Sequence, residues 1–141
     1  MQHVTLTLPM LPDMELTASK TACAMGEHIG MSQDKIEEVQ MAVVEACINA
    51  FEHSRADERE VHMHLLVLGN EDAPEGIEIT IQDAGVGISP IRLDKMKEHA
   101  ESSGLLPRKR GHGLRIISGL MDAVDIHSNA EGTTVIMRKM R

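Results

Sequence analysis

The chain has 141 residues, which predicts a single domain (residues 1–141), because domains contain roughly 100–200 residues. Its 42% hydrophobic and 26% charged residues are ordinary for a globular protein, so a disordered or collagen-like chain is excluded. The net charge of −8 and the near absence of aromatic rings argue against direct binding of nucleic acid. We find no signal peptide and no membrane-spanning stretch, and we expect Cys23 and Cys47 to be buried, reduced thiols. These features predict a cytoplasmic protein.

The N-terminal half predicts one strand and two helices. Alternating apolar residues predict a strand over residues 3–8, and apolar residues at helical spacing predict a helix over 13–29. A longer helix is predicted to run to about His53, with either Ser32 or Asp34 as its N-cap; Asp34 also begins a capping-box pattern. The expected buried stripe of this helix consists of Ile36, Val39, Val43, Ala46 and Ala50.

The C-terminal half predicts a hairpin, a long loop region and a closing helix–strand–strand unit. Residues 60–68 and 77–83 alternate as strands and are joined by a short polar loop, as in a hairpin. The remaining expected elements are a loop region over 85–113 with a short helical piece near 91–99, a helix over 114–123, and strands over 124–127 and 133–137. Interleaved helices and strands with a hairpin favour a mixed α/β two-layer sandwich, of the α+β kind, over a doubly wound parallel sheet.

Three polar residues follow one another on the long helix. Glu45, Asn49 and His53 are four residues apart, so they lie on one helical face. The amide oxygen of Asn is a ligand for a hard cation, and Glu can act as a base. A solvated stripe is the alternative explanation for this spacing.

The second motif, Asp83-Ala84-Gly85-Val86-Gly87, directly follows a predicted strand. A carboxylate at a strand end can accept hydrogen bonds from an exocyclic amine, and Gly85 and Gly87 allow the backbone to approach a ligand closely. A tight turn that leads into a loop is the alternative interpretation.

The third motif is Gly111-His112-Gly113-Leu114, which opens a helix. Glycines before a helix leave free N–H groups for phosphate at the positive end of the helix dipole. The basic run Arg108-Lys109-Arg110 stands just ahead of it and suits a polyphosphate. A glycine-capped helix start is the alternative.

The order of the three motifs is more specific than any one of them. The chain has neither a P-loop nor a Rossmann fingerprint. An E-x-x-x-N helix, then D-x-G-x-G, then G-x-G at a helix start resembles the ATP-binding domain of gyrase, Hsp90, histidine kinases and MutL (GHKL). Within this superfamily the chain is most similar to the bacterial anti-sigma factor serine-protein kinases of the RsbW/SpoIIAB type. The resemblance implies the Bergerat fold, a mixed, mainly antiparallel sheet with helices on one face.

The resemblance also implies roles for individual residues. Asn49 would coordinate Mg²⁺ at the ATP phosphates, and Glu45 would be the general base that activates the acceptor hydroxyl. Asp83 would receive the adenine amino group, and Thr134 would complete the adenine pocket.

The glycine motifs and the loop region would enclose the rest of the nucleotide. Gly85 and Gly87 would let the chain pass close to ATP, and the segment from Gly111 to Leu114 would present backbone N–H groups to the phosphates. Residues 89–110 would form an ATP lid, in which one of Arg108, Lys109 and Arg110 reaches the γ-phosphate.

The family resemblance implies a serine-protein kinase that phosphorylates an anti-sigma-factor antagonist of the STAS type and sequesters a sigma factor, usually as a homodimer. ATP and ADP would drive this partner switch. The alternative is a nucleotide-dependent binding module that acts on another partner with little turnover. A histidine kinase is a third possibility, but it predicts a helix pair with a phosphoacceptor histidine ahead of the first strand, and we expect none.

Overall fold

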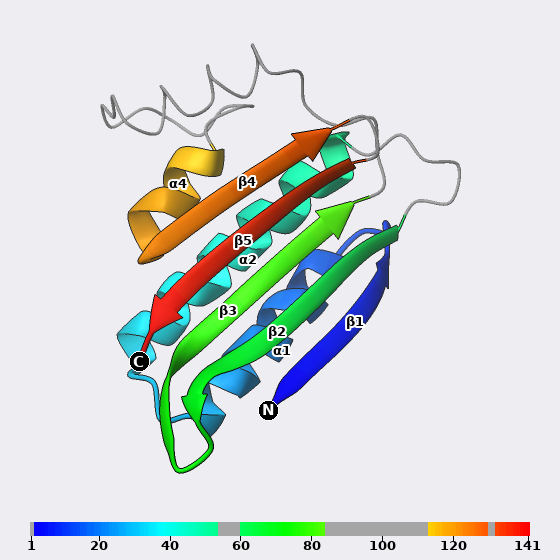
Figure 1. Cartoon of the computed structure of the whole chain (residues 1–141). Coiled ribbons are helices and arrows are strands. Elements are labelled where there is room, and N and C mark those ends of the chain that lie inside the picture. Colours follow the sequence, from blue (N-terminus) through cyan, green and yellow to red (C-terminus); the bar gives the residue numbers. More distant parts are fainter. Residues whose placement is uncertain (1, 54–59, 84–112, 130–131) are drawn as a thin grey trace.

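The computed structural model describes residues 2–53, 60–83, 113–129 and 132–141, and Figure 1 shows the arrangement of the elements. Each element predicted within these ranges is present, with small shifts of its ends. In chain order the elements are β1 (His3–Pro9), α1 (Met14–His28), α2 (Gln33–His53), β2 (Glu60–Asn70), β3 (Ala73–Asp83), α4 (Gly113–Leu120), β4 (Ala123–Asn129) and β5 (Gly132–Met140).

The five strands form one sheet in the order β1-β2-β3-β5-β4, and every pair in it is antiparallel. Helices α1 and α2 lie side by side on one face of this sheet, and α4 packs against α2 and β4 (Figure 1). The two-layer sandwich with helices on one face is therefore confirmed. The predicted hairpin is also present, as β2 and β3.

The hydrophobic core lies between the sheet and the two long helices. Alternation along β2 and β3 turns one set of side chains toward the helices, and the predicted stripe of α2 covers them. The fully buried strand residues are Val61, Met63, Leu65, Ile77, Ile79, Ile81 and Met137, and all five residues of the α2 stripe are buried. The two-residue period of the strands and the 3.6-residue period of the helix therefore turn apolar side chains toward the same core.

Local signals at the helix ends set the boundary between α1 and α2. Gly30 has a φ of 77° in the left-handed region, which ends α1. The Ser32 hydroxyl accepts a hydrogen bond from the N–H of Lys35 at 3.4 Å, so Ser32 is the N-cap of α2. Asp34 is the second residue of the helix, and the capping box predicted from it is wrong.

Both cysteines are free, but only Cys47 is buried as expected. Cys23 is half-buried, which corrects the expectation that both thiols lie in the core. Across the described helices, none combines the length and the apolar character needed to cross a bilayer.

Candidate functional site

The C-terminal end of β3 carries a buried carboxylate beside the start of β5. Asp83 is the last residue of β3 and only 4% exposed, and its Oδ1 accepts a hydrogen bond from the N–H of Thr133 at 3.4 Å. The Thr133 hydroxyl lies 3.0 Å from the Ser128 hydroxyl of β4. Three neighbouring strands therefore place polar groups in a row at one end of the sheet.

Side-chain alternation decides which β5 residue joins this row. Thr134 pairs with Gln82 of β3 and His127 of β4, so its side chain lies on the face that the helices leave uncovered. Asp83 and Thr133 lie on the opposite, helix-covered face. The structure thus brings Thr133, and not Thr134, to Asp83.

Two of the predicted residues lie on successive turns of α2. Glu45 is 6% exposed and lines a cavity of about 420 Å³ together with Ile116 of α4. Asn49 is half-buried one turn further along. The remaining described residues of the cavity lining are Gln40, Met41 and Val44. The Glu45 carboxylate thus lines the side of α2 that faces α4, and Asn49 follows it on the same helical face.

The opposite side of the same turn of α2 belongs to the core. Cys47 is fully buried, and burial together with the Glu15 carboxylate raises the pKa of its thiol to about 12. The two polar side chains of the motif are therefore separated from the apolar interior by the helix itself. In the segment 45–49, helical geometry thus places Cys47 in the core and Glu45 on the other side of the helix.

Helix α4 begins at Gly113, as the third motif predicts, and Leu114 lies in its first turn. The structure therefore places a helix N-terminus where phosphate-binding N–H groups are expected. Gly85, Gly87, Arg110, Gly111 and His112 lie outside the described residues, as does the predicted lid over 89–110, so their roles stay predictions.

Sequence comparison relates nearly the whole chain to known proteins. A profile of the histidine kinase-like ATPase domain matches residues 9–139. The serine-protein kinase RsbW of Oceanobacillus iheyensis is 30% identical over 142 residues, which cover 97% of this chain and 85% of that protein. The anti-sigma F factor of the same organism is 29% identical and is covered to 91%. The serine-protein kinase RsbW of Bacillus cereus is 27% identical and is covered to 84%.

Structure comparison shows that solved proteins share the fold. The RsbU and RsbW domains of a Mycobacterium tuberculosis protein superpose with a TM-score of 0.69 and 17% identity; the match covers 99% of this chain and 33% of that one. The SiaB–SiaC complex of Pseudomonas aeruginosa gives 0.60 at 9% identity, with 98% and 89% covered. A blue-light activated histidine kinase domain of Erythrobacter litoralis gives 0.54 at 17% identity, with 93% and 64% covered.

Proposed function

Because this chain belongs to the histidine kinase-like ATPase domain family and is related to serine-protein kinases over nearly its whole length, we propose that it is an ATP-dependent kinase and anti-sigma factor. Its substrate in this proposal is a serine of a small anti-sigma-factor antagonist of the STAS type. Phosphorylation releases the antagonist, and the kinase is then free to sequester a sigma factor, as the name of one relative, anti-sigma F factor, suggests for that protein.

The observation that carries the kinase proposal is the placement of Glu45. A carboxylate that is 6% exposed and faces a cavity between two helices is well placed to accept a proton from a hydroxyl that enters there. Phosphoryl transfer needs little covalent chemistry from the protein, but it does need an oriented nucleophile. A protein that only binds nucleotide has no need of a base at this position.

The described residues fit an adenine nucleotide. The buried carboxylate of Asp83 suits an exocyclic amino group, which can donate to it, and the N–H of Thr133 holds one of its oxygens in place. We assign Thr133 to the adenine pocket in the role first expected of Thr134. Gly113 and Leu114 at the start of α4 contribute N–H groups to the phosphates.

The described residues also fit Mg²⁺ that is bound mainly by phosphate. Among them no group of three His, Cys, Asp or Glu side chains could hold a metal by itself. Mg²⁺ keeps several waters and takes few protein ligands beside substrate phosphates, so a single amide oxygen from Asn49 is sufficient. The ion, when bound, supplies neutralisation of phosphate charge.

The remaining parts of the proposal concern the extent of the domain, the rest of the nucleotide site, the oligomeric state and the location in the cell. We propose one ATPase domain over residues 1–141 with a lid over 89–110, in which Gly85, Gly87, Arg110, Gly111 and His112 complete the nucleotide site. We further propose a cytoplasmic homodimer, in keeping with a regulator that exchanges a sigma factor for an antagonist.

A labelling assay tests the kinase proposal. The purified chain is incubated with γ-labelled ATP, Mg²⁺ and each STAS-domain protein of the source genome in turn. We expect one of them to be labelled on serine, and Glu45→Gln to lower the rate by about a hundredfold or more while ATP still binds. Glu37→Gln, an exposed carboxylate on the same helix, is the matched control and should act like wild type.

The alternative function is a nucleotide-dependent binding module. Its signature in the same assay is wild-type ATP binding with none of the STAS proteins labelled. That result would contradict the kinase proposal and leave the nucleotide site standing.

A further inference from the structure

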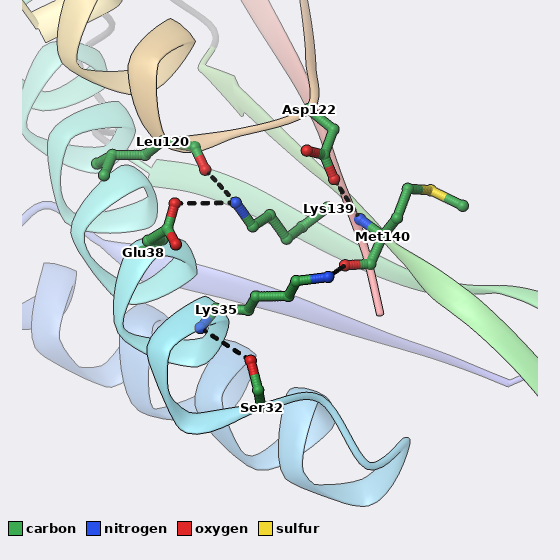
Figure 2. Close-up of polar contacts among 7 residues, drawn as sticks. All are labelled: Ser32, Lys35, Glu38, Leu120, Asp122, Lys139 and Met140. Atoms are coloured by element: carbon green, nitrogen blue, oxygen red, sulfur yellow. Dashed lines mark hydrogen bonds and ion pairs between the residues drawn. The ribbon is translucent and has the colours of Figure 1, made fainter.

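A buried lysine joins the sheet to both helices that line the candidate site. Lys139 of β5 has a side chain only 7% exposed, and its Nζ lies 3.0 Å from the carboxylate Oε2 of Glu38 on α2. The same Nζ donates a hydrogen bond to the backbone carbonyl of Leu120, the last residue of α4. Figure 2 shows the lysine between the two helices, pointing toward both acceptors.

Asp122, two residues after the end of α4, adds two more hydrogen bonds between this part of the chain and β5. Its N–H donates to the carbonyl of Arg138 at 2.9 Å. Its Oδ2 accepts the N–H of Met140 at 2.7 Å, as Figure 2 shows. Residues 138–140 are therefore bonded, one after another, to the segment that ends α4. The C-terminal end of α4 is thus fixed to β5 by side-chain and backbone groups together.

The two helices joined by Lys139 are those that carry the proposed phosphate-side chemistry. Glu38 precedes Glu45 by two turns of α2, about 10 Å along the helix axis. Leu120 is one end of α4, and Gly113, at its other end, opens toward the proposed phosphates. A cation at the C-terminal end of α4 also complements the negative pole of the helix dipole.

We propose that Lys139 is a positioning residue for phosphoryl transfer. By holding the end of α4 against Glu38, it sets where the N-terminus of α4 lies relative to Glu45 and Asn49. This inference rests on the proposed function and adds to it a residue that touches no nucleotide. Ion pairing by itself would be weak evidence of such a role, but here one buried cation bridges two helices and a strand.

The test uses Lys139→Met, which removes the charge and keeps the length of the side chain. Three properties are measured: amide exchange of α4 without nucleotide, affinity for ATP, and the rate of transfer to the antagonist at saturating ATP. We expect α4 exchange to be about tenfold faster. We also expect the maximal transfer rate to fall about tenfold or more, because small misplacements of reacting groups are costly.

Two further variants separate positioning from stability. Arg138→Met removes the neighbouring ion pair with Glu78, 2.9 Å long, whose arginine is 56% exposed, and it should leave transfer unchanged. Lys139→Arg keeps the charge and should restore most of the transfer rate. A lysine that only stabilised the fold would lower the melting temperature without changing the maximal rate of the folded protein.

Either wild-type α4 exchange or a wild-type transfer rate in folded Lys139→Met would overturn the inference. Should that variant fail to fold, Glu38→Gln carries the test, since the Glu38 side chain is 39% exposed. A loss of about threefold in transfer supports the inference there, and an unchanged rate overturns it. If wild type does not bind ATP, the proposed function itself is contradicted. If wild type binds ATP but α4 exchange is unchanged in Lys139→Met, only the positioning role is contradicted.

Discussion

The backbone N–H of Thr133 donates to the carboxylate of Asp83 at 3.4 Å, whereas the next residue, Thr134, turns its side chain to the other face of the sheet. This relationship joins β5 to the end of β3 where the D-x-G-x-G motif begins. It also places a second hydroxyl, that of Ser128, 3.0 Å from the Thr133 hydroxyl. The proposed adenine pocket therefore draws on three strands.

The two threonines provide a direct comparison. Thr133→Val keeps the backbone N–H that bonds to Asp83 but removes the hydroxyl that lies 3.0 Å from that of Ser128, and it should weaken ATP binding about tenfold, because a polar group of the proposed adenine pocket is lost. Thr134→Val changes only the uncovered face and should alter affinity less than about twofold. Calorimetric titration with ATP and Mg²⁺ measures both. The reverse ranking of the two variants would contradict the assignment of Thr133.

The stability of the fold should depend on which face of the sheet is changed. Ile79→Ala leaves a cavity between the sheet and the helices and should lower the free energy of unfolding by about 2–5 kcal/mol. Ile136→Ala, at a half-buried position on the uncovered face, should cost about 1 kcal/mol. Urea unfolding followed by circular dichroism compares them. Equal losses would show that the uncovered face is packed as tightly as the core.

The two cysteines should differ in reactivity. Burial raises the pKa of Cys47 to about 12, so its reactive thiolate is nearly absent in the folded protein at pH 8. Desolvation and the Glu27 carboxylate also raise the pKa of Cys23, but its thiol is accessible. Iodoacetamide should modify Cys23 slowly in the native state and both thiols in denaturant. Mass spectrometry of the alkylated chain decides, and rapid native labelling of Cys47 would contradict its burial.

The raised pKa of Cys47 also predicts the alkaline dependence of stability. Above the ordinary thiol value of 9.0 the unfolded chain loses this proton, while the folded chain keeps it up to about 12. The unfolded state then binds fewer protons, so stability contributed by this group is complete below pH 9 and falls as the pH rises toward 12. Urea unfolding at several alkaline pH values measures the slope.

Much of the fold could be predicted because its signals are periodic. The apolar stripe from Ile36 to Ala50 and the alternation in β2 and β3 each specify one buried face, and the structure packs these faces together. Glycine and hydroxyl signals marked the junction of α1 and α2 to within two residues. Ser32 and Asp34 are both suitable N-cap residues by type, so the sequence did not decide between them. The choice depended on where the first helical turn begins.

The site was less predictable where it depends on register and on distant partners. Gly132 is followed by two identical threonines, and only the pairing of β5 with β3 decides which one meets Asp83. Lys139 contacts Glu38 and Leu120, which lie 101 and 19 positions away in the sequence, and no local sequence pattern predicts such contacts. Glu45 and Asn49, by contrast, are four residues apart on one helix, so their shared face followed from the sequence.

Calorimetric titration with ATP and Mg²⁺ of wild type, Asp83→Asn and Gln82→Ala tests the central claim most directly. The account predicts saturable binding in wild type, a loss of about tenfold to a hundredfold in Asp83→Asn because a charged acceptor is lost, and no change in Gln82→Ala, which alters the uncovered face. GTP should bind weakly to wild type, since guanine offers a carbonyl where adenine offers an amine. No binding of ATP to wild type, or equal affinity in Asp83→Asn, would contradict the nucleotide site on which the proposed kinase depends.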